Sequence, residues 1–214
     1  MPTKVKFCGI TRLEDAEAAI RLDAWAIGLN LWEGSSRFLE APAAAAIAAA
    51  VKRRVEIAGI FVNPALRDVE ERSAAIGLTL VQLHGDEGPR FCGEVARRTG
   101  CPVIKAVRVG NSGDVRAADA FSTAFHLFDS RHGSAYGGTG KSFDWGLLRG
   151  RRRSVPAILA GGLDPVNVGE AVTIADPFAV DVSTGVESSP GVKDEALMEA
   201  FSGAVREAGA SVGA

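Results

Sequence analysis

The stretch Lys4–Arg12, KVKFCGITR, sets the pattern on which the rest of the chain is built. A short apolar run ends at Cys8, a glycine follows, and Thr11 precedes an acidic, helix-like segment that starts at Leu13. This order predicts a strand, a turn and a helix, with Thr11 as the helix cap. The carboxyl end of a strand is where α/β enzymes place their reactive groups. Cys8 is therefore the first candidate for a functional residue.

Seven further apolar runs of strand length follow, with helix-like intervals between them. The eight predicted strands are Val5–Cys8, Trp25–Asn30, Val55–Val62, Leu78–His84, Pro102–Val109, Phe125–Asp129, Pro156–Ala160 and Phe178–Ser183. Their starts are about 20 to 31 residues apart, which leaves room for one helix and two short loops. The runs are nearly continuous in apolar residues, as in parallel strands that are covered on both faces. Eight such repeats predict an α/β fold, a (β/α)8 barrel, rather than an open doubly wound sheet.

The intervals carry ordinary helix signals. The predicted helices are Leu13–Leu22, Ala43–Val51, Pro64–Ile76, Pro89–Thr99, Val166–Ile174 and Val192–Ala208. Gly77, Gly100 and Gly209 stand where helices commonly end, and Asp164 with Pro165 is typical of a helix start. No linker or change in composition divides the chain, so residues 1–214 are predicted to form a single domain with short loops.

Composition excludes several classes of function. The net charge is −2 with acidic and basic residues mixed, so no nucleic-acid partner is expected. The three cysteines lack metal-ligand spacing, which predicts a reduced, cytoplasmic protein without zinc or structural disulfides. No signal peptide is apparent, and no apolar run approaches the roughly 20 residues of a membrane span, so no membrane partner is expected.

The polar residues that end the eight runs are the candidates for function, because the strands of a barrel open onto one mouth at their carboxyl ends. They are Cys8, Asn30, Asn63, Gln82, His84, Arg108, Asp129, Gly161, Gly162, Ser183, Thr184 and Gly185. Glycine-rich turns follow the seventh and eighth runs, where barrels usually bind phosphate through backbone N–H groups and helix N-termini. The sequence therefore predicts a phosphorylated ligand there.

Several candidates have two interpretations. Asp129 is either a turn residue or a general acid, and Arg37 is either a surface arginine or a clamp for a substrate carboxylate. Gln82 and His84 fit a core or rim role equally well. The segment Ala135–Ser142 nearly matches a P-loop, but it follows Asp129 only after five further residues and opens no long helix. A loop over the barrel mouth, with Lys141 as an anion contact, explains its glycines better.

The motifs together resemble those of the phosphoribosylanthranilate isomerase family of the tryptophan pathway. The resemblance rests on KFCGITR, SSRF at 35–38, GIFVN at 59–63, VQLHG at 81–85, GGTGKSFDW at 137–145, ILAGGL at 158–163 and DVSTGVESSPG at 181–191. The motifs occur in order from residue 4 to beyond residue 191. The set as a whole is specific, although no single motif decides.

The resemblance implies a cofactor-free (β/α)8 barrel that carries out an Amadori rearrangement of a phosphosugar. Under it, Cys8 is the general base, Asp129 the general acid and Arg37 the contact for the anthranilate carboxylate. It also implies these substrate contacts: Gln82, His84, Gly138, and, at the phosphate, Gly161, Gly162, Ser183, Thr184 and Gly185. Monomer and homodimer both stay open.

A free thiol titrates near ~8.5, so Cys8 needs a positive or dipolar neighbourhood to act as a base near neutral pH. Lys6 and the start of the first helix are the candidates. Two other functions stay open. One is another phosphosugar isomerase with paired aspartates on its first and fifth strands, against which Cys8 argues. The other is a catalytically silent barrel that senses a phosphorylated metabolite.

Overall fold

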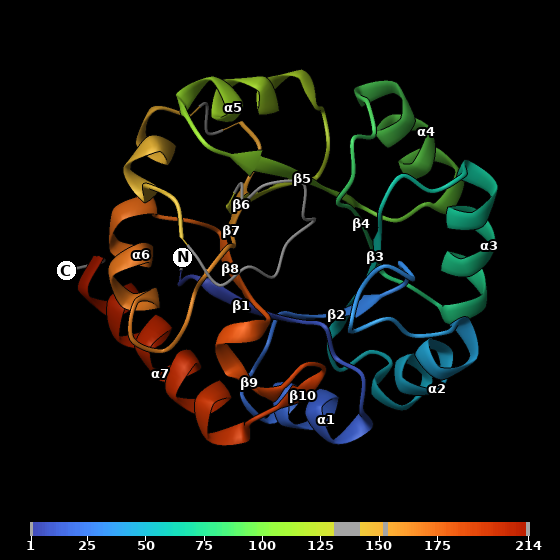
Figure 1. The fold of residues 1–214 in the computed structure, drawn as a ribbon, viewed down its shortest axis with the longest axis horizontal. Coiled ribbons are helices and arrows are strands. Elements are labelled where there is room, and N and C mark those ends of the chain that lie inside the picture. Colours follow the sequence, from blue (N-terminus) through green and yellow to red (C-terminus); the bar gives the residue numbers. More distant parts are fainter. Residues whose placement is uncertain (1, 131–141, 152–153, 213–214) are drawn as a thin grey trace.

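Eight parallel strands close into a barrel in the computed structural model, which describes residues 2–130, 142–151 and 154–212. They are β1 (Lys4–Cys8), β2 (Ala26–Asn30), β3 (Glu56–Phe61), β4 (Leu80–Leu83), β5 (Val103–Val109), β6 (Phe125–Ser130), β7 (Ala157–Leu159) and β8 (Ala179–Val182). Each strand pairs with the next, and β8 pairs with β1 (Figure 1). The predicted barrel is confirmed, with one strand in every predicted run.

The helices form a ring outside the barrel (Figure 1). The longer ones are α1 (Leu13–Arg21), α2 (Ala41–Val51), α3 (Leu66–Ile76), α4 (Pro89–Thr99), α6 (Val168–Ala175) and α7 (Glu195–Val212). A short α5 (Ser112–Ala117) runs into the 3-10 turn η1 (Ala118–Ala120), and a second 3-10 turn, η2 (Trp145–Gly150), lies between β6 and β7. The predicted helix ends at Gly77 and Gly100 are confirmed, with both glycines in the left-handed region.

Several predicted helix ends are wrong. Thr11 does not cap α1, because its hydroxyl donates to the carbonyl oxygen of Gly191 instead. The carboxylate of Asp164 accepts from the N–H groups of Val166 and Asn167, and this turn delays the start of α6 to Val168. Helix α7 continues past Gly209, where an end was predicted.

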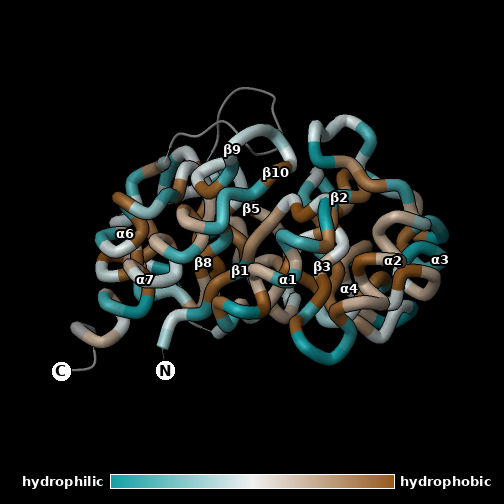
Figure 2. Tube along the Cα trace, turned by 90° about the horizontal axis from the view of Figure 1, so that it is seen from below, coloured by the Kyte–Doolittle hydropathy of each residue, from teal (hydrophilic) through white to brown (hydrophobic). Residues whose placement is uncertain are grey.

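The start of α7 is displaced by a hairpin that was not predicted. Val192 and Lys193 form β10, which pairs antiparallel with β9 (Glu187–Ser189), so the helix begins only at Glu195. The 3-10 turn η3 (Thr184–Val186) leads from β8 into this hairpin. Seen from the side, the hairpin lies at the end of the barrel opposite the N-terminus (Figure 2). It therefore stands at the mouth, where the strands end.

The barrel interior is filled by small and aliphatic side chains: Ala26, Ala58, Leu80, Ile104, Ala106, Leu127, Ile158, Ala160 and Ala179. Because side chains alternate across a strand, the residue two positions further on faces the same side. Three polar residues therefore face the interior like the apolar residue two positions before them: Gln82 after Leu80, Asp129 after Leu127 and Asp181 after Ala179. The apolar layer forms a floor, and the polar residues that follow it stand on that floor at the mouth.

In the described part of the chain, no helix is long and apolar enough to cross a membrane.

Candidate active site

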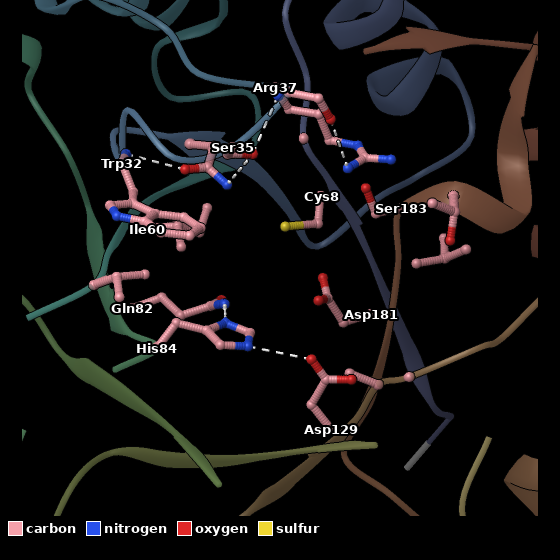
Figure 3. Close-up of a pocket in the computed structure, with 18 of the residues that line it drawn as sticks. Cys8, Trp32, Ser35, Arg37, Ile60, Gln82, His84, Asp129, Asp181 and Ser183 are labelled. Carbon is pink, nitrogen blue, oxygen red and sulfur yellow. Dashed lines mark hydrogen bonds and ion pairs between the residues drawn. The ribbon is translucent and has the colours of Figure 1, made fainter. Parts of the chain in front are cut away.

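A cavity of about 320 Å³ opens at the carboxyl ends of the strands (Figure 3). Ten of the residues predicted from sequence line it together: Cys8, Asn30, Arg37, Gln82, His84, Asp129, Gly161, Gly162, Ser183 and Thr184. Two other candidates, Asn63 and Arg108, do not line this cavity. Gly185 lies behind this lining, where any side chain would collide with the carbonyl oxygen of Leu163. Gly138 and Lys141 fall outside the described residues.

On one side of the cavity, the thiol of Cys8 stands beside a buried ion pair. Lys6 precedes Cys8 by two residues on β1, so both face the interior. The fully buried ammonium of Lys6 donates to Asp181 Oδ1 at 2.7 Å, and Lys6 lies opposite Asp181 in the β1–β8 register. We call Cys8, Lys6 and Asp181 the base cluster.

Opposing effects act on the thiol of the base cluster. Burial raises the pKa of Cys8 and the charge of Asp181 raises it further, whereas Lys6 and Lys193 lower it. Burial alone would lower the pKa of Lys6, but Asp181 and Cys8 hold it above its ordinary value. Lys6 is thus the cationic neighbour that the sequence suggested. The net result is nevertheless a raised pKa for Cys8, because desolvation is the larger effect.

Gly28 on β2 provides the space for this cluster. Cys8 pairs with Gly28 in the β1–β2 register. A Cβ atom at this position would lie 2.9 Å from Cys8 Sγ and 3.1 Å from Lys6 Nζ. Both distances are shorter than the usual contact of a carbon atom. A glycine is therefore needed here to let the thiol and the ammonium approach each other.

On the other side, Asp129 ends a line of hydrogen bonds between side chains. Its Oδ1 accepts from the backbone N–H of Ser130 at 2.8 Å, and its Oδ2 lies 3.2 Å from His84 Nε2. His84 Nδ1 in turn lies 2.9 Å from Gln82 Nε2 (Figure 3). We call Gln82, His84 and Asp129 the acid line. Asp129 faces the cavity rather than capping a helix, which favours the functional interpretation.

Arg37, in the loop after β2, is already paired with a carboxylate of the protein. Its Nε and Nη2 donate to the two oxygens of Glu187 at 2.7 and 2.6 Å. Lys193 Nζ donates to the same Glu187 at 2.8 Å and to the carbonyl oxygen of Ser183. Burial would raise the pKa of Glu187, but Arg37 and Lys193 hold it below its ordinary value. Glu187 thus occupies the side edge of the guanidinium, formed by Nε and Nη2. The end of the guanidinium, formed by Nη1 and Nη2, is the part that a ligand can contact.

The loops after β7 and β8 meet over the remaining wall. Gly161 and Gly162 have positive φ angles of 86° and 66°, a conformation that glycine adopts without strain. A Cβ at Gly161 would lie 2.7 Å from Asp129 Oδ1, so this loop also approaches the acid line closely. Within the described structure, the buried hydroxyl of Ser183 has no hydrogen-bond partner. Such a hydroxyl is a ready contact for a polar ligand.

Sequence reasoning missed three charged residues of the site: Asp181, Glu187 and Lys193. Lys6 was predicted as a cation near the thiol, but not as the partner of Asp181 in a buried ion pair. The same alternation that places Cys8 inside the barrel also places Lys6 there, so this signal was available. Glu187 and Lys193 come from the β9–β10 hairpin, for which the sequence offers no clear pattern. Among the described residues, no group of His, Cys, Asp and Glu could hold a metal ion.

The fold and the site define a class of protein: a (β/α)8-barrel enzyme with a thiol and a carboxylate on one cavity at its mouth. A family model described as N-(5′-phosphoribosyl)anthranilate (PRA) isomerase matches residues 5–204. The chain belongs to this family.

Relatives and solved structures agree with this assignment. The N-(5′-phosphoribosyl)anthranilate isomerase of Neisseria meningitidis serogroup C is 46% identical, over 92% of this chain and 94% of that protein. Its counterpart from Myxococcus xanthus is 45% identical, over 94% of this chain and 95% of the relative. The crystal structure of the Thermotoga maritima enzyme superposes with a TM-score of 0.88 at 37% identity, covering 96% of this chain and 99% of that one.

A further structure of phosphoribosyl anthranilate isomerase holds reduced 1-(o-carboxyphenylamino)-1-deoxyribulose 5-phosphate. It matches with a TM-score of 0.83 at 34% identity, over 96% of this chain and 99% of that chain. Another structure is described as monomers generated from the dimeric Thermotoga maritima enzyme. That protein is therefore known in both forms.

Proposed function

We propose that this protein is an isomerase that converts N-(5′-phosphoribosyl)anthranilate to 1-(2-carboxyphenylamino)-1-deoxyribulose 5-phosphate, a step of tryptophan biosynthesis. The observation that carries the proposal is that Cys8 and Asp129 face one cavity from β1 and β6, in a chain of this family. The reaction moves a proton from one carbon to another and opens a sugar ring. It therefore needs one proton donor and one proton acceptor and no net redox partner.

Asp129, in its protonated form, is the acid of the first step. It gives its proton to the ring oxygen of the ribose while the bond between that oxygen and carbon 1 breaks. The lone pair of the anthranilate nitrogen forms the double bond to carbon 1, which gives an open-chain Schiff base. The negative charge left on Asp129 is held by the N–H of Ser130 and by His84.

Cys8, as the thiolate, is the base of the second step. It removes the proton from carbon 2, and the electrons of that C–H bond form an enolamine. Tautomerisation to the ketone moves the hydroxyl proton of carbon 2 away and returns a proton to carbon 1. Since burial raises the pKa of Cys8, the thiolate is the minor form in the free protein, and Lys6 stabilises it.

The remaining contacts position the substrate. The end of the Arg37 guanidinium, formed by Nη1 and Nη2, binds the anthranilate carboxylate, because the side edge already donates to Glu187. The loops at Gly161–Gly162 and Ser183–Gly185 bind the phosphate, which the unpartnered hydroxyl of Ser183 supports. Trp32, Ile60 and Val62 line the cavity with apolar surface, against which an aromatic ring packs. We place the reaction in the cytoplasm, where the three free cysteines stay reduced.

The test is the decay of phosphoribosylanthranilate fluorescence on addition of the protein. Rapid decay with the wild type is expected. Cys8→Ser and Asp129→Asn are expected to slow it by about 10²–10⁴-fold each, with the fold retained. Cys101→Ser is the matched control, since this thiol donates to the carbonyl oxygen of Leu78 as a hydroxyl also can. Ligand binding without decay by the wild type would support the sensor instead, and near-normal decay in either site variant contradicts the assigned roles.

A further inference from the structure

In the acid line, Gln82 is connected to Asp129 through the imidazole of His84. Gln82 Nε2 lies 2.9 Å from His84 Nδ1, and His84 Nε2 lies 3.2 Å from Asp129 Oδ2. Figure 3 shows the three side chains in one row, from β4 to β6 across the mouth. Both ring nitrogens of His84 are thus engaged by the protein itself.

The amide of Gln82 decides which nitrogen of His84 carries the proton. An amide NH₂ group only donates, so Nδ1 must be the bare nitrogen that accepts from it. A neutral imidazole then carries its single hydrogen on Nε2 and donates it to Asp129 Oδ2. If the carbonyl oxygen of the amide faced Nδ1 instead, the hydrogen would have to lie on Nδ1, and Nε2 would be bare.

The position of Gln82 in the barrel favours the tautomer of His84 that carries its hydrogen on Nε2. Its side chain is fully buried, and its backbone pairs with Ile60 on β3 and Ile104 on β5. In the described part of the chain, Gln82 Oε1 finds no hydrogen-bond partner. The residue therefore leaves one polar atom unsatisfied in the interior while its NH₂ group serves His84. A buried polar atom without a partner costs about 1–3 kcal/mol, so in the described residues it is the contact with His84 that favours this orientation of the amide.

The tautomer of His84 determines where the acidic proton of Asp129 can lie. When Nε2 carries a hydrogen, no second hydrogen fits between Nε2 and Oδ2. The proton that Asp129 carries as an acid is then directed away from His84, toward the cavity. When Nε2 is bare, it accepts the proton of Asp129 in a hydrogen bond, and the substrate loses access to it.

We propose that Gln82 is a positioning residue for the isomerisation: it selects the Nε2–H tautomer of His84 and thereby directs the acidic proton of Asp129 to the substrate. The inference rests on the proposed function for its effect on turnover. The tautomer itself is a property of the resting protein and does not depend on which reaction the protein carries out.

The experiment is ¹⁵N NMR of protein labelled at histidine, since the chain has only three histidines. In the wild type, His84 is expected to show a protonated Nε2 and a bare Nδ1, and His84→Asn assigns its signals. His126 is the internal control: its Nε2 donates to the carbonyl oxygen of Phe121 at 2.9 Å. Its tautomer is expected to stay the same in every variant that folds.

Two variants change the selection in different ways. In Gln82→Glu, a carboxylate can only accept, so His84 is expected to gain a hydrogen on Nδ1. In Gln82→Met, no donor remains, and both tautomers are expected. We expect kcat to fall about 10²-fold in Gln82→Glu and less in Gln82→Met. KM should stay within about twofold in both, because the buried NH₂ group of Gln82 is engaged by His84, which makes Gln82 a positioning residue rather than the substrate contact that the resemblance implied.

The outcomes separate this inference from the proposed function. A bare Nε2 in wild-type His84 overturns the inference. This measurement needs no variant, so the inference can be tested even if the Gln82 variants fail to fold. A normal kcat in Gln82→Glu despite the altered tautomer also overturns it, as does a raised KM with unchanged kcat, which is the mark of a direct substrate contact. A wild type that does not turn over phosphoribosylanthranilate contradicts the proposed function and the catalytic role of Gln82, whereas the tautomer measurement is unaffected.

Discussion

The two sides of the cavity handle protons by different means. In the base cluster, Lys6 and Asp181 are opposite charges held 2.7 Å apart inside the barrel, and both act on the buried thiol of Cys8. In the acid line, an amide and an imidazole connect to Asp129 through hydrogen bonds. A thiolate is an anion in a poorly solvated place, so it needs a nearby cation. An acid must direct its proton toward the atom that receives it, and hydrogen bonds to the acid from its neighbours determine that direction.

The largest effect is expected from removing the cation of the base cluster. Lys6→Met leaves Asp181 as a buried carboxylate without its partner, which typically destabilises a protein by about 3–5 kcal/mol. It also removes a group that lowers the pKa of Cys8, so turnover at neutral pH should fall strongly. Chemical denaturation and the fluorescence assay measure the two effects.

A double variant sharpens the same point. Lys6→Met with Asp181→Leu removes both charges, and an apolar replacement of a buried ion pair is often neutral for stability. We expect stability to recover while turnover stays low. Recovery of turnover together with stability would mean that the pair serves only the fold.

A smaller effect is expected from closing the space opposite the thiol. A methyl group in Gly28→Ala would press on Cys8 Sγ and Lys6 Nζ, and overpacking of this kind costs about 1–3 kcal/mol. Gly93→Ala in α4 is the matched control, because a Cβ there meets no atom within 4 Å. It should stabilise the helix by up to about 1 kcal/mol. Thermal unfolding of the pair should give opposite signs, and equal signs would contradict the packing argument.

The smallest effect is expected in the titration of the thiol. The carboxylate of Asp181 is one of the groups that raise the pKa of Cys8, so Asp181→Asn should lower it. The thiolate should then form at a lower pH than in the wild type. The pH profile of iodoacetamide labelling, followed by mass spectrometry of the peptide that contains Cys8, measures this directly. A profile that moves to higher pH would show that Asp181 acts mainly by holding Lys6 in place.

The sequence predicted the barrel well because its signals are local and repeated. Eight apolar runs at regular intervals left little choice of fold, and Cys8, Asp129 and the glycine turns were found as the residues that end those runs. The errors have local causes too. Thr11 and Val192 were assigned to a helix start, but contacts with residues about 180 positions away or with a hairpin partner determine their conformation.

The less predictable part of the site is the part made by tertiary contacts. Nothing in the sequence pairs Arg37 with Glu187, which lies 150 residues further along the chain. The short α5, which was not predicted, does carry a local signal: Asn111 and Asp114 form a reciprocal cap. The hydrogen bond between His84 and Asp129 joins β4 to β6, so only the closed barrel brings it about.

The division of labour between the two sides is tested most directly by the deuterium isotope effect at carbon 2 of the ribose. Cys8→Ser should show a primary isotope effect on its residual turnover, because removal of that hydrogen limits the rate. Asp129→Asn should show an effect close to one, because ring opening comes first and has become slow. Equal primary isotope effects in the two variants would contradict the account, since Asp129 would then not be needed before the step of Cys8.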